Sequence, residues 1–255
     1  MTYTPGFTSH FTSRSRRSLR SLAVTALAAA FVAACGGGSS GSLDLATLQG
    51  RWESTGAASP QTAIIVPAAS SAAGASVWLL NRDGSALSWL DARPSGSDGL
   101  LASGSTYPLS ASNAGPQPLS WSGTVNLAAN SLSVNGATLQ LTRTDTLKSA
   151  SSLGDVTGNW SATFTGAAVA VNLGVAANGS ISGQASTGCA YSGQLSARSD
   201  IKVFDATLTE SCNGSVQNFN GIGTYRVDAS PGASALTLAL RKQDGSAALV
   251  ILLAR

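Results

Sequence analysis

Residues 48–52, Leu-Gln-Gly-Arg-Trp, return later in the chain as residues 156–160, Val-Thr-Gly-Asn-Trp. Each copy opens with a Gly-x-Trp at the start of a run that alternates apolar and polar residues. Each copy also closes with an aliphatic-x-Leu-x-Arg pattern, at 139–143 in the first and at 251–255 in the second. The spacing from Trp to Arg is nearly the same in both. The chain therefore contains an internal repeat.

The repeat divides the chain into two units of ordinary domain size. The first unit spans 44–144, a linker spans 145–155, and the second unit spans 156–255. One large sandwich built from both halves is the alternative.

Short alternating or β-branched runs fill both units, and helical periodicity is nearly absent. Strands at about 8–12-residue spacing with turn signals are typical of an all-β sandwich or barrel. The expected strands are 62–66, 77–80, 87–91, 119–127, 138–142, 159–164, 169–173, 180–184, 190–195, 203–209, 223–227, 236–240 and 248–253. The expected hairpin turns, in which both residues tolerate positive φ, are Asp83-Gly84, Asn135-Gly136, Asn178-Gly179 and Asp244-Gly245. The sequence thus predicts an all-β fold of two tandem antiparallel β-meander units, each a small barrel or sandwich.

The N-terminus has the composition of an export signal. Residues 1–20 are polar and basic, residues 22–34 form an apolar run, and Cys35 follows. This order predicts a secretory signal peptide over 1–34, because a membrane-spanning helix needs about 20 apolar residues. Residues 15–19, Ser-Arg-Arg-Ser-Leu, also fit a twin-arginine export signal, and plain arginine enrichment explains them equally well.

The tetrapeptide Val32-Ala33-Ala34-Cys35 resembles the lipobox of bacterial lipoproteins. The resemblance implies cleavage before Cys35, a diacylglycerol on its thiol and a membrane partner through that anchor. Gly36 in place of Asp implies, by the same resemblance, the outer rather than the inner membrane. Residues 35–43 then form a flexible Gly/Ser tether, and multiple acyl chains make anchoring stable. An ordinary secretory signal with an incidental Cys35 is the alternative.

Charge and histidine content exclude several functional classes. The chain carries a formal net charge of +3, but Arg14, Arg16, Arg17 and Arg20 precede the mature part. From residue 36 onward eleven basic residues face twelve acidic ones, so no nucleic-acid-binding surface is expected. The only histidine is His10, which removes Ser-His-Asp and Cys-His catalysis and His-ligated zinc from the mature part.

The catalytic motifs that remain lack their structural context. Residues 37–41 match G-x-S-x-G inside the tether, where no strand and helix frame a nucleophile. Residues 199–202 match S-x-x-K in an expected turn, without the helix that would bring Ser199 and Lys202 together. Phosphate loops, dinucleotide fingerprints and calcium loops are not found. The sequence therefore predicts no enzyme activity, no cofactor and no metal.

The Gly-x-Trp of the first strand and the Arg of the last strand resemble those of lipocalins and avidins. In those antiparallel barrels the Trp plugs one end and the Arg packs across its face. The resemblance implies the pairs Trp52 with Arg143 and Trp160 with Arg255, as ligand or barrel-end residues. A guanidinium over an indole gains about 0.5–2 kcal/mol. Ordinary core tryptophans and surface arginines are the alternative.

Cys189 and Cys212 are the only cysteines left after lipidation. In an oxidising compartment such a pair usually forms a disulfide. A hairpin turning around 198–202 places the two opposite each other, and the bridge is worth roughly 3 kcal/mol. The same register places Tyr191 opposite Glu210 on one face. Glu210 is then either a solvated rim residue or a polar hook for a ligand, accepting from Tyr191.

Two classes of function remain. The first is a non-catalytic cell-envelope lipoprotein with a structural or partner-binding role toward an envelope protein or polymer. The second is a lipoprotein that carries a small apolar ligand inside calycin-like barrels, which a central cavity of at least about 300 Å³ would favour over a filled core. Trp78, Trp89 and Trp121 join Trp52 in the first unit and predict either an aromatic ligand surface or core packing.

Overall fold

The computed structural model describes residues 41–54, 60–68, 74–109, 115–136, 138–164, 169–227 and 234–255. The expected signal peptide, Cys35 and most of the tether lie outside these residues. Both sheets described below belong to one compact unit, Ser40–Arg255. Neither of the two short helices among the described residues is long and apolar enough to cross a membrane.

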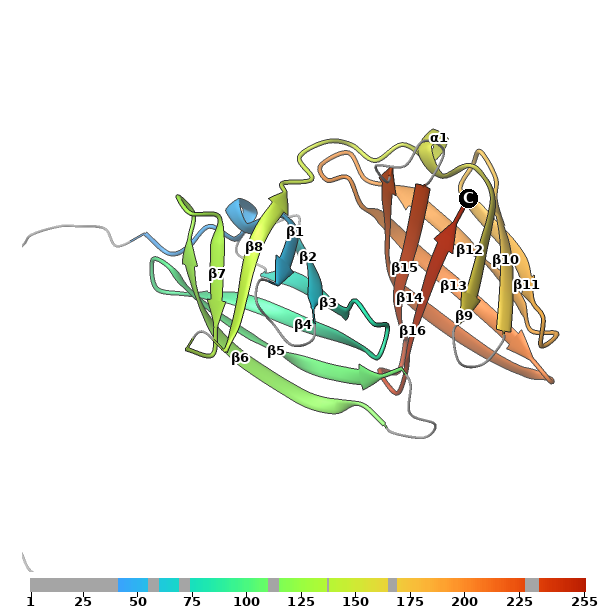
Figure 1. The fold of residues 1–255 in the computed structure, drawn as a ribbon, viewed down its shortest axis with the longest axis horizontal. Helices are drawn as coiled ribbons and strands as arrows, with labels where there is room; N and C mark the ends of the chain where they lie inside the picture. The colour runs from blue at the N-terminus through green and yellow to red at the C-terminus, as the bar shows by residue number, and fades with distance from the viewer. Residues whose placement is uncertain are drawn as a thin grey trace, which may run out of the picture. The chain divides into compact units, whose positions relative to one another are not determined.

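The first sheet is an antiparallel meander of eight strands that closes into a barrel (Figure 1). A 3₁₀ turn, η1 (Leu45–Leu48), precedes it. Strand order follows chain order, and β8 returns to pair with β1. Its strands are β1 (Gly50–Ser54), β2 (Gln61–Pro67), β3 (Ala75–Asn81), β4 (Ala86–Ser95), β5 (Gly99–Pro108), β6 (Gln117–Asn126), β7 (Ser131–Val134) and β8 (Leu139–Asp145).

The second sheet repeats this plan after a short helix, α1 (Leu153–Val156). It also closes, although β16 and β9 share only the register pair Ala254↔Ser161. The expected fold class is confirmed, and the alternative of one merged sandwich is wrong because each half closes its own sheet. The strands are β9 (Gly158–Phe164), β10 (Val169–Val175), β11 (Ser180–Ala185), β12 (Ala190–Ala197), β13 (Phe204–Cys212), β14 (Ser215–Val227), β15 (Ser234–Lys242) and β16 (Ala248–Ala254).

Apolar side chains fill the interior of each barrel. Successive strand residues point to opposite faces, so alternate positions of β6, from Trp121 to Val125, are buried and their neighbours exposed. The inward residues form one continuous apolar cluster in each barrel. Among the largest fully buried side chains are Trp52, Leu90, Leu132, Trp160, Leu173 and Phe204.

All four expected hairpin turns lie between consecutive strands, but the expected backbone conformation holds at one of them. Asn135 and Gly136 both have positive φ, at 48° and 65°. At the other three turns only the glycine does. There the Asp or Asn side chain accepts a hydrogen bond from the amide two residues on, as Asp83 Oδ1 does from Ser85 N at 2.9 Å. Asn213-Gly214, which the sequence analysis does not predict, is a second turn in which both residues have positive φ.

Candidate functional site

The predicted contact between Trp52 and Arg143 is present in the first barrel. Trp52 is fully buried, and its Nε1 donates to the Leu48 carbonyl at 2.9 Å. The Arg143 guanidinium carbon lies 5.3 Å from the centroid of the Trp52 ring, and its Nη1 donates to the Thr47 carbonyl. The pair therefore ties η1 to the barrel wall.

The predicted contact between Trp160 and Arg255 is present in the second barrel. Trp160 Nε1 donates to the Val156 carbonyl at 2.7 Å, and the Arg255 guanidinium carbon lies 4.3 Å from the ring centroid. Two nitrogens of Arg255 donate to the carbonyls of Thr157 and Asp155, at 2.6 and 2.8 Å. With a contact from Nε to Ser234 Oγ, three of the five N–H groups of Arg255 are engaged. Both predicted Trp–Arg contacts are therefore present, and the role of these residues at a ligand or at the barrel end stays a prediction.

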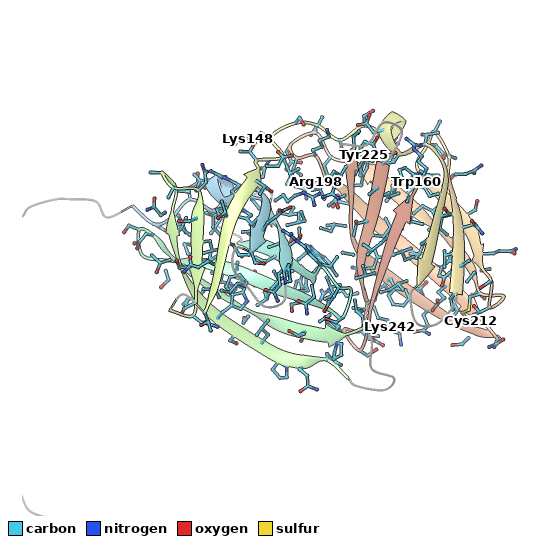
Figure 2. The ribbon with its side chains drawn as sticks, in the orientation of Figure 1. Lys148, Trp160, Arg198, Cys212, Tyr225 and Lys242 are labelled. Carbon is cyan, nitrogen blue, oxygen red and sulfur yellow. A yellow bond between two sulfur atoms is a disulfide. The ribbon has the colours of Figure 1, made fainter. Side chains whose placement is uncertain are left out.

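The disulfide predicted between Cys189 and Cys212 is present, with the two Cα atoms 4.4 Å apart. Figure 2 shows Cys212 and Trp160 toward opposite ends of the second barrel. The predicted register holds, since Tyr191 lies opposite Glu210, and the Tyr191 hydroxyl donates to Glu210 Oε1 at 2.8 Å. Burial and this hydrogen bond raise the pKa of Tyr191. The role of Glu210 as a ligand hook stays a prediction.

The same corner holds a cluster of three side chains with metal-ligating atoms, Cys189, Glu210 and Cys212. Metal-binding cysteines act as thiolates. Both sulfurs are joined in the disulfide, so the cluster offers a metal only one carboxylate.

The outer faces of the two barrels contact each other through a third apolar cluster. In strand β2, five consecutive residues from Ala63 to Pro67 are buried. One face of this strand packs inside the first barrel, and the other face contributes to the third cluster. Trp78 of β3 packs toward Gly221 of β14, where an added Cβ would lie only 3.0 Å from the ring. The members are Ile64, Val66, Trp78, Leu87, Leu147, Ile201, Val203, Ile222, Ala239 and Val250.

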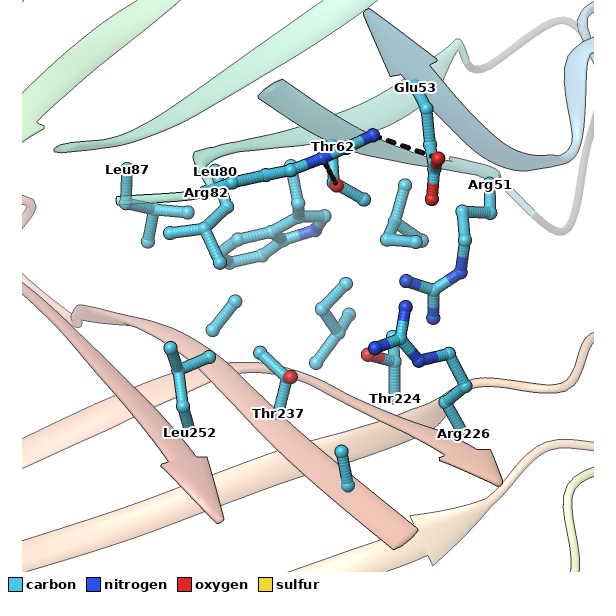
Figure 3. A pocket seen from close by; sticks show the side chains of 15 residues that line it. Arg51, Glu53, Thr62, Leu80, Arg82, Leu87, Thr224, Arg226, Thr237 and Leu252 are labelled. Carbon is cyan, nitrogen blue, oxygen red and sulfur yellow. Dashed lines mark hydrogen bonds and ion pairs between the residues drawn. The ribbon is translucent and has the colours of Figure 1, made fainter. Parts of the chain in front are cut away.

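Beside this cluster lies a cleft of about 420 Å³ whose walls come from both barrels (Figure 3). Its volume falls within the range of about 300–1,000 Å³ that small-molecule sites occupy. One wall comes from β1 to β4 and the other from β14 to β16. The lining residues are Arg51, Glu53, Thr62, Ile64, Trp78, Leu80, Arg82, Leu87, Ile222, Thr224, Arg226, Ala235, Thr237, Ala239 and Leu252.

The charged residues of the cleft are three arginines and one glutamate. Arg82 Nη2 pairs with Glu53 Oε2 at 2.8 Å. Figure 3 shows the guanidinium groups of Arg51 and Arg226 facing each other across the cleft. Burial, and next the charge of Arg226, lower the pKa of Arg51 and outweigh the opposing effects of Glu53 and Asp145. Among the described residues of the lining, basic side chains therefore outnumber acidic ones.

A second hollow, of about 440 Å³, borders the same barrel contact on another side. The Arg241 guanidinium carbon lies 3.7 Å above the centroid of Trp89 in its wall. This contact covers one face of Trp89, and Trp78 is buried between the barrels. Trp52 and Trp121 therefore pack inside the first barrel, whereas Trp78 and Trp89 pack between the barrels. A ligand surface formed by these tryptophans stays a prediction.

Comparisons of the chain with protein-family models, curated proteins and solved structures find no significant match. The function is therefore inferred from the chain's own residues. The sequence reasoning missed the cleft, although Arg51 lies inside the repeated motif between Gly50 and Trp52. A charged residue that alternates with inward residues points outward, but the sequence does not show what it faces there.

Proposed function

We propose that the chain is an exported, lipid-anchored binding protein of the cell envelope without catalytic activity, and that the two barrels form one binding cleft between them. The observation that carries this proposal is the difference between the barrel interiors and the cleft between the barrels. Each barrel interior holds a continuous apolar cluster, whereas a cleft of about 420 Å³ with apolar and charged walls opens between the barrels. A hollow of about 550 Å³ beside Trp160 and Arg255 belongs to the second barrel alone, and it is lined mainly by polar residues and glycines.

This difference favours a ligand between the barrels over a ligand inside a barrel, and over a purely structural role. A ligand inside a barrel would have to displace the packed cluster and the buried Trp52 or Trp160. Displacing packed side chains of this size costs several kcal/mol. A purely structural role is the second candidate, because the apolar clusters favour it over a ligand inside a barrel.

Export and anchoring are supported from two parts of the chain. The order of basic residues, apolar run and Cys35 fits a lipoprotein signal. The disulfide between Cys189 and Cys212 fits a protein that matures in an oxidising compartment. The absence of histidine after His10 supports the non-catalytic assignment.

The proposal is tested with an exported Cys35→Ser form of the full chain, released from the membrane and analysed by native mass spectrometry. We expect a bound small molecule that Ala235→Trp removes, because Ala235 lines the cleft and an indole there would fill it. The matched control is Leu101→Trp on β5, at an exposed position outside the cleft. Retention of the molecule by the Ala235→Trp form, or no bound molecule in any form, would contradict the proposal.

A further inference from the structure

We infer that the cleft between the barrels binds a small amphipathic anion, with an oxyanion headgroup at Arg51 and an apolar tail along Trp78 toward Leu87 and Leu252. This inference rests on the proposed function and names the class of ligand.

The cleft separates charge from apolar surface along its length. Figure 3 shows Arg51 and Arg226 at one end and Leu87 and Leu252 at the other. Trp78, only 6% exposed, is the one aromatic residue among the described residues that line the cleft. A ligand that matches this surface has one charged end and one apolar end.

The sign of the charged end follows from the ion pairs of the cleft. Glu53 pairs with Arg82 and is the only carboxylate among the described residues of the lining. Asp145 of β8, outside this lining, also acts on the charge of Arg51. Arg226 makes other interactions of its own. The Arg51 guanidinium, by contrast, is half-buried and makes no hydrogen bond or ion pair with the described residues. A desolvated cation near another cation is stabilised by an anion.

The planar geometry of a guanidinium limits the chemical class of the headgroup further. Its N–H groups match the two oxygens of a carboxylate or phosphate in a bidentate contact. Such a contact also tolerates the neighbouring Arg226, because an oxyanion placed between two guanidiniums attracts both. Carboxylate and phosphate headgroups therefore share the chemistry expected here.

Isothermal titration of the exported Cys35→Ser form with three ten-carbon probes tests the inference. The probes are decanoate, decan-1-ol and decyltrimethylammonium, which differ in the charge of the headgroup. We expect decanoate to bind at least tenfold more tightly than decan-1-ol, and the ammonium probe to bind more weakly than both. Octanoate should bind more than tenfold more weakly than decanoate, since each buried methylene contributes about fourfold in affinity.

Two charge variants locate the headgroup. Arg51→Gln should weaken decanoate binding at least tenfold and leave decan-1-ol binding unchanged. Arg93→Gln is the matched control, because Arg93 is an exposed arginine paired with Asp91 outside the cleft. It should leave the affinities for both probes unchanged.

The outcomes separate this inference from the proposed function. Equal affinity for decanoate and decan-1-ol, with both lost in Ala235→Trp, would overturn the anion assignment and keep the cleft as the binding site. Decanoate binding that survives Ala235→Trp would overturn both. No binding of any probe, or equal losses in Arg51→Gln and Arg93→Gln, would overturn the inference alone.

Discussion

Replacing Trp160 with Phe tests how the second barrel is closed. The substitution keeps an aromatic ring at a position that is 2% exposed, and it removes the Nε1 donor that lies 2.7 Å from the Val156 carbonyl. The carbonyl then remains buried without its partner, which costs about 1–3 kcal/mol. A weaker contact with Arg255 and a small void add about 1 kcal/mol. We expect the free energy of unfolding to fall by about 2–4 kcal/mol.

Trp78→Phe is the matched control for this experiment. It removes the same atoms from another buried ring, but Trp78 Nε1 donates no hydrogen bond to the described residues. We expect a loss below about 1 kcal/mol, because only the void contributes. Urea unfolding with the disulfide kept oxidised, followed by circular dichroism, gives both free energies. Equal losses in the two variants, or a loss below 1 kcal/mol for Trp160→Phe, would refute the hydrogen-bonded closure.

Three further predictions concern the anchor, the disulfide and Tyr191. Cys35→Ser should move the protein from the membrane fraction to the soluble fraction, and unchanged partitioning after washing would disprove lipidation. Non-reducing peptide mapping should recover Cys189 and Cys212 in one linked peptide, and reduction should lower stability by about 3 kcal/mol; free thiols at both positions would contradict this. Above the ordinary tyrosine pKa of 10, the unfolded chain loses a proton that folded Tyr191 keeps, so the free energy of unfolding should fall with rising pH. Tyr191→Phe should make that fall shallower in pH-dependent urea unfolding, and an unchanged slope would show that Tyr191 does not contribute.

The sequence predicted those parts of the fold that depend on neighbouring residues. Alternation located most strands, and the turn around 198–202 determined the register that joins Cys189 to Cys212. Local patterns suffice there because a meander pairs each strand with the next one along the chain.

Three strand segments were missed because their residues have weak strand propensity. The strand β5 carries Gly104 in its middle and small polar residues around it, and β7 has only four residues. The first half of β14, from Ser215, is rich in polar residues. Gly104 is required by packing, since an added Cβ would lie 2.0 Å from the Trp89 carbonyl oxygen. Glycine in a strand often marks such a close approach.

The cleft could not be predicted from the sequence. Its lining residues occupy outward positions on strands of both barrels, such as Arg51 on β1 and Arg226 on β14. Alternation shows that these side chains leave the barrel interior, but it does not show that another barrel covers them. The buried outward positions of β2, such as Ile64, indicate the contact between the barrels. In the sequence alone, they look like ordinary strand residues.

Each barrel ends beside the place where it begins. Arg51 is paired with Asp145 across the β1–β8 ladder, and Arg255 reaches back to the carbonyls that precede β9. Because every strand neighbours its successor, the polypeptide follows a ring in which the starting point is arbitrary. A circularly permuted barrel, opened at the exposed Asn135-Gly136 turn and rejoined between β8 and β1, would keep all of its strand pairings. The same property allows a barrel to be duplicated in tandem without any strand of one copy pairing with the other copy. The two halves of this chain have this arrangement.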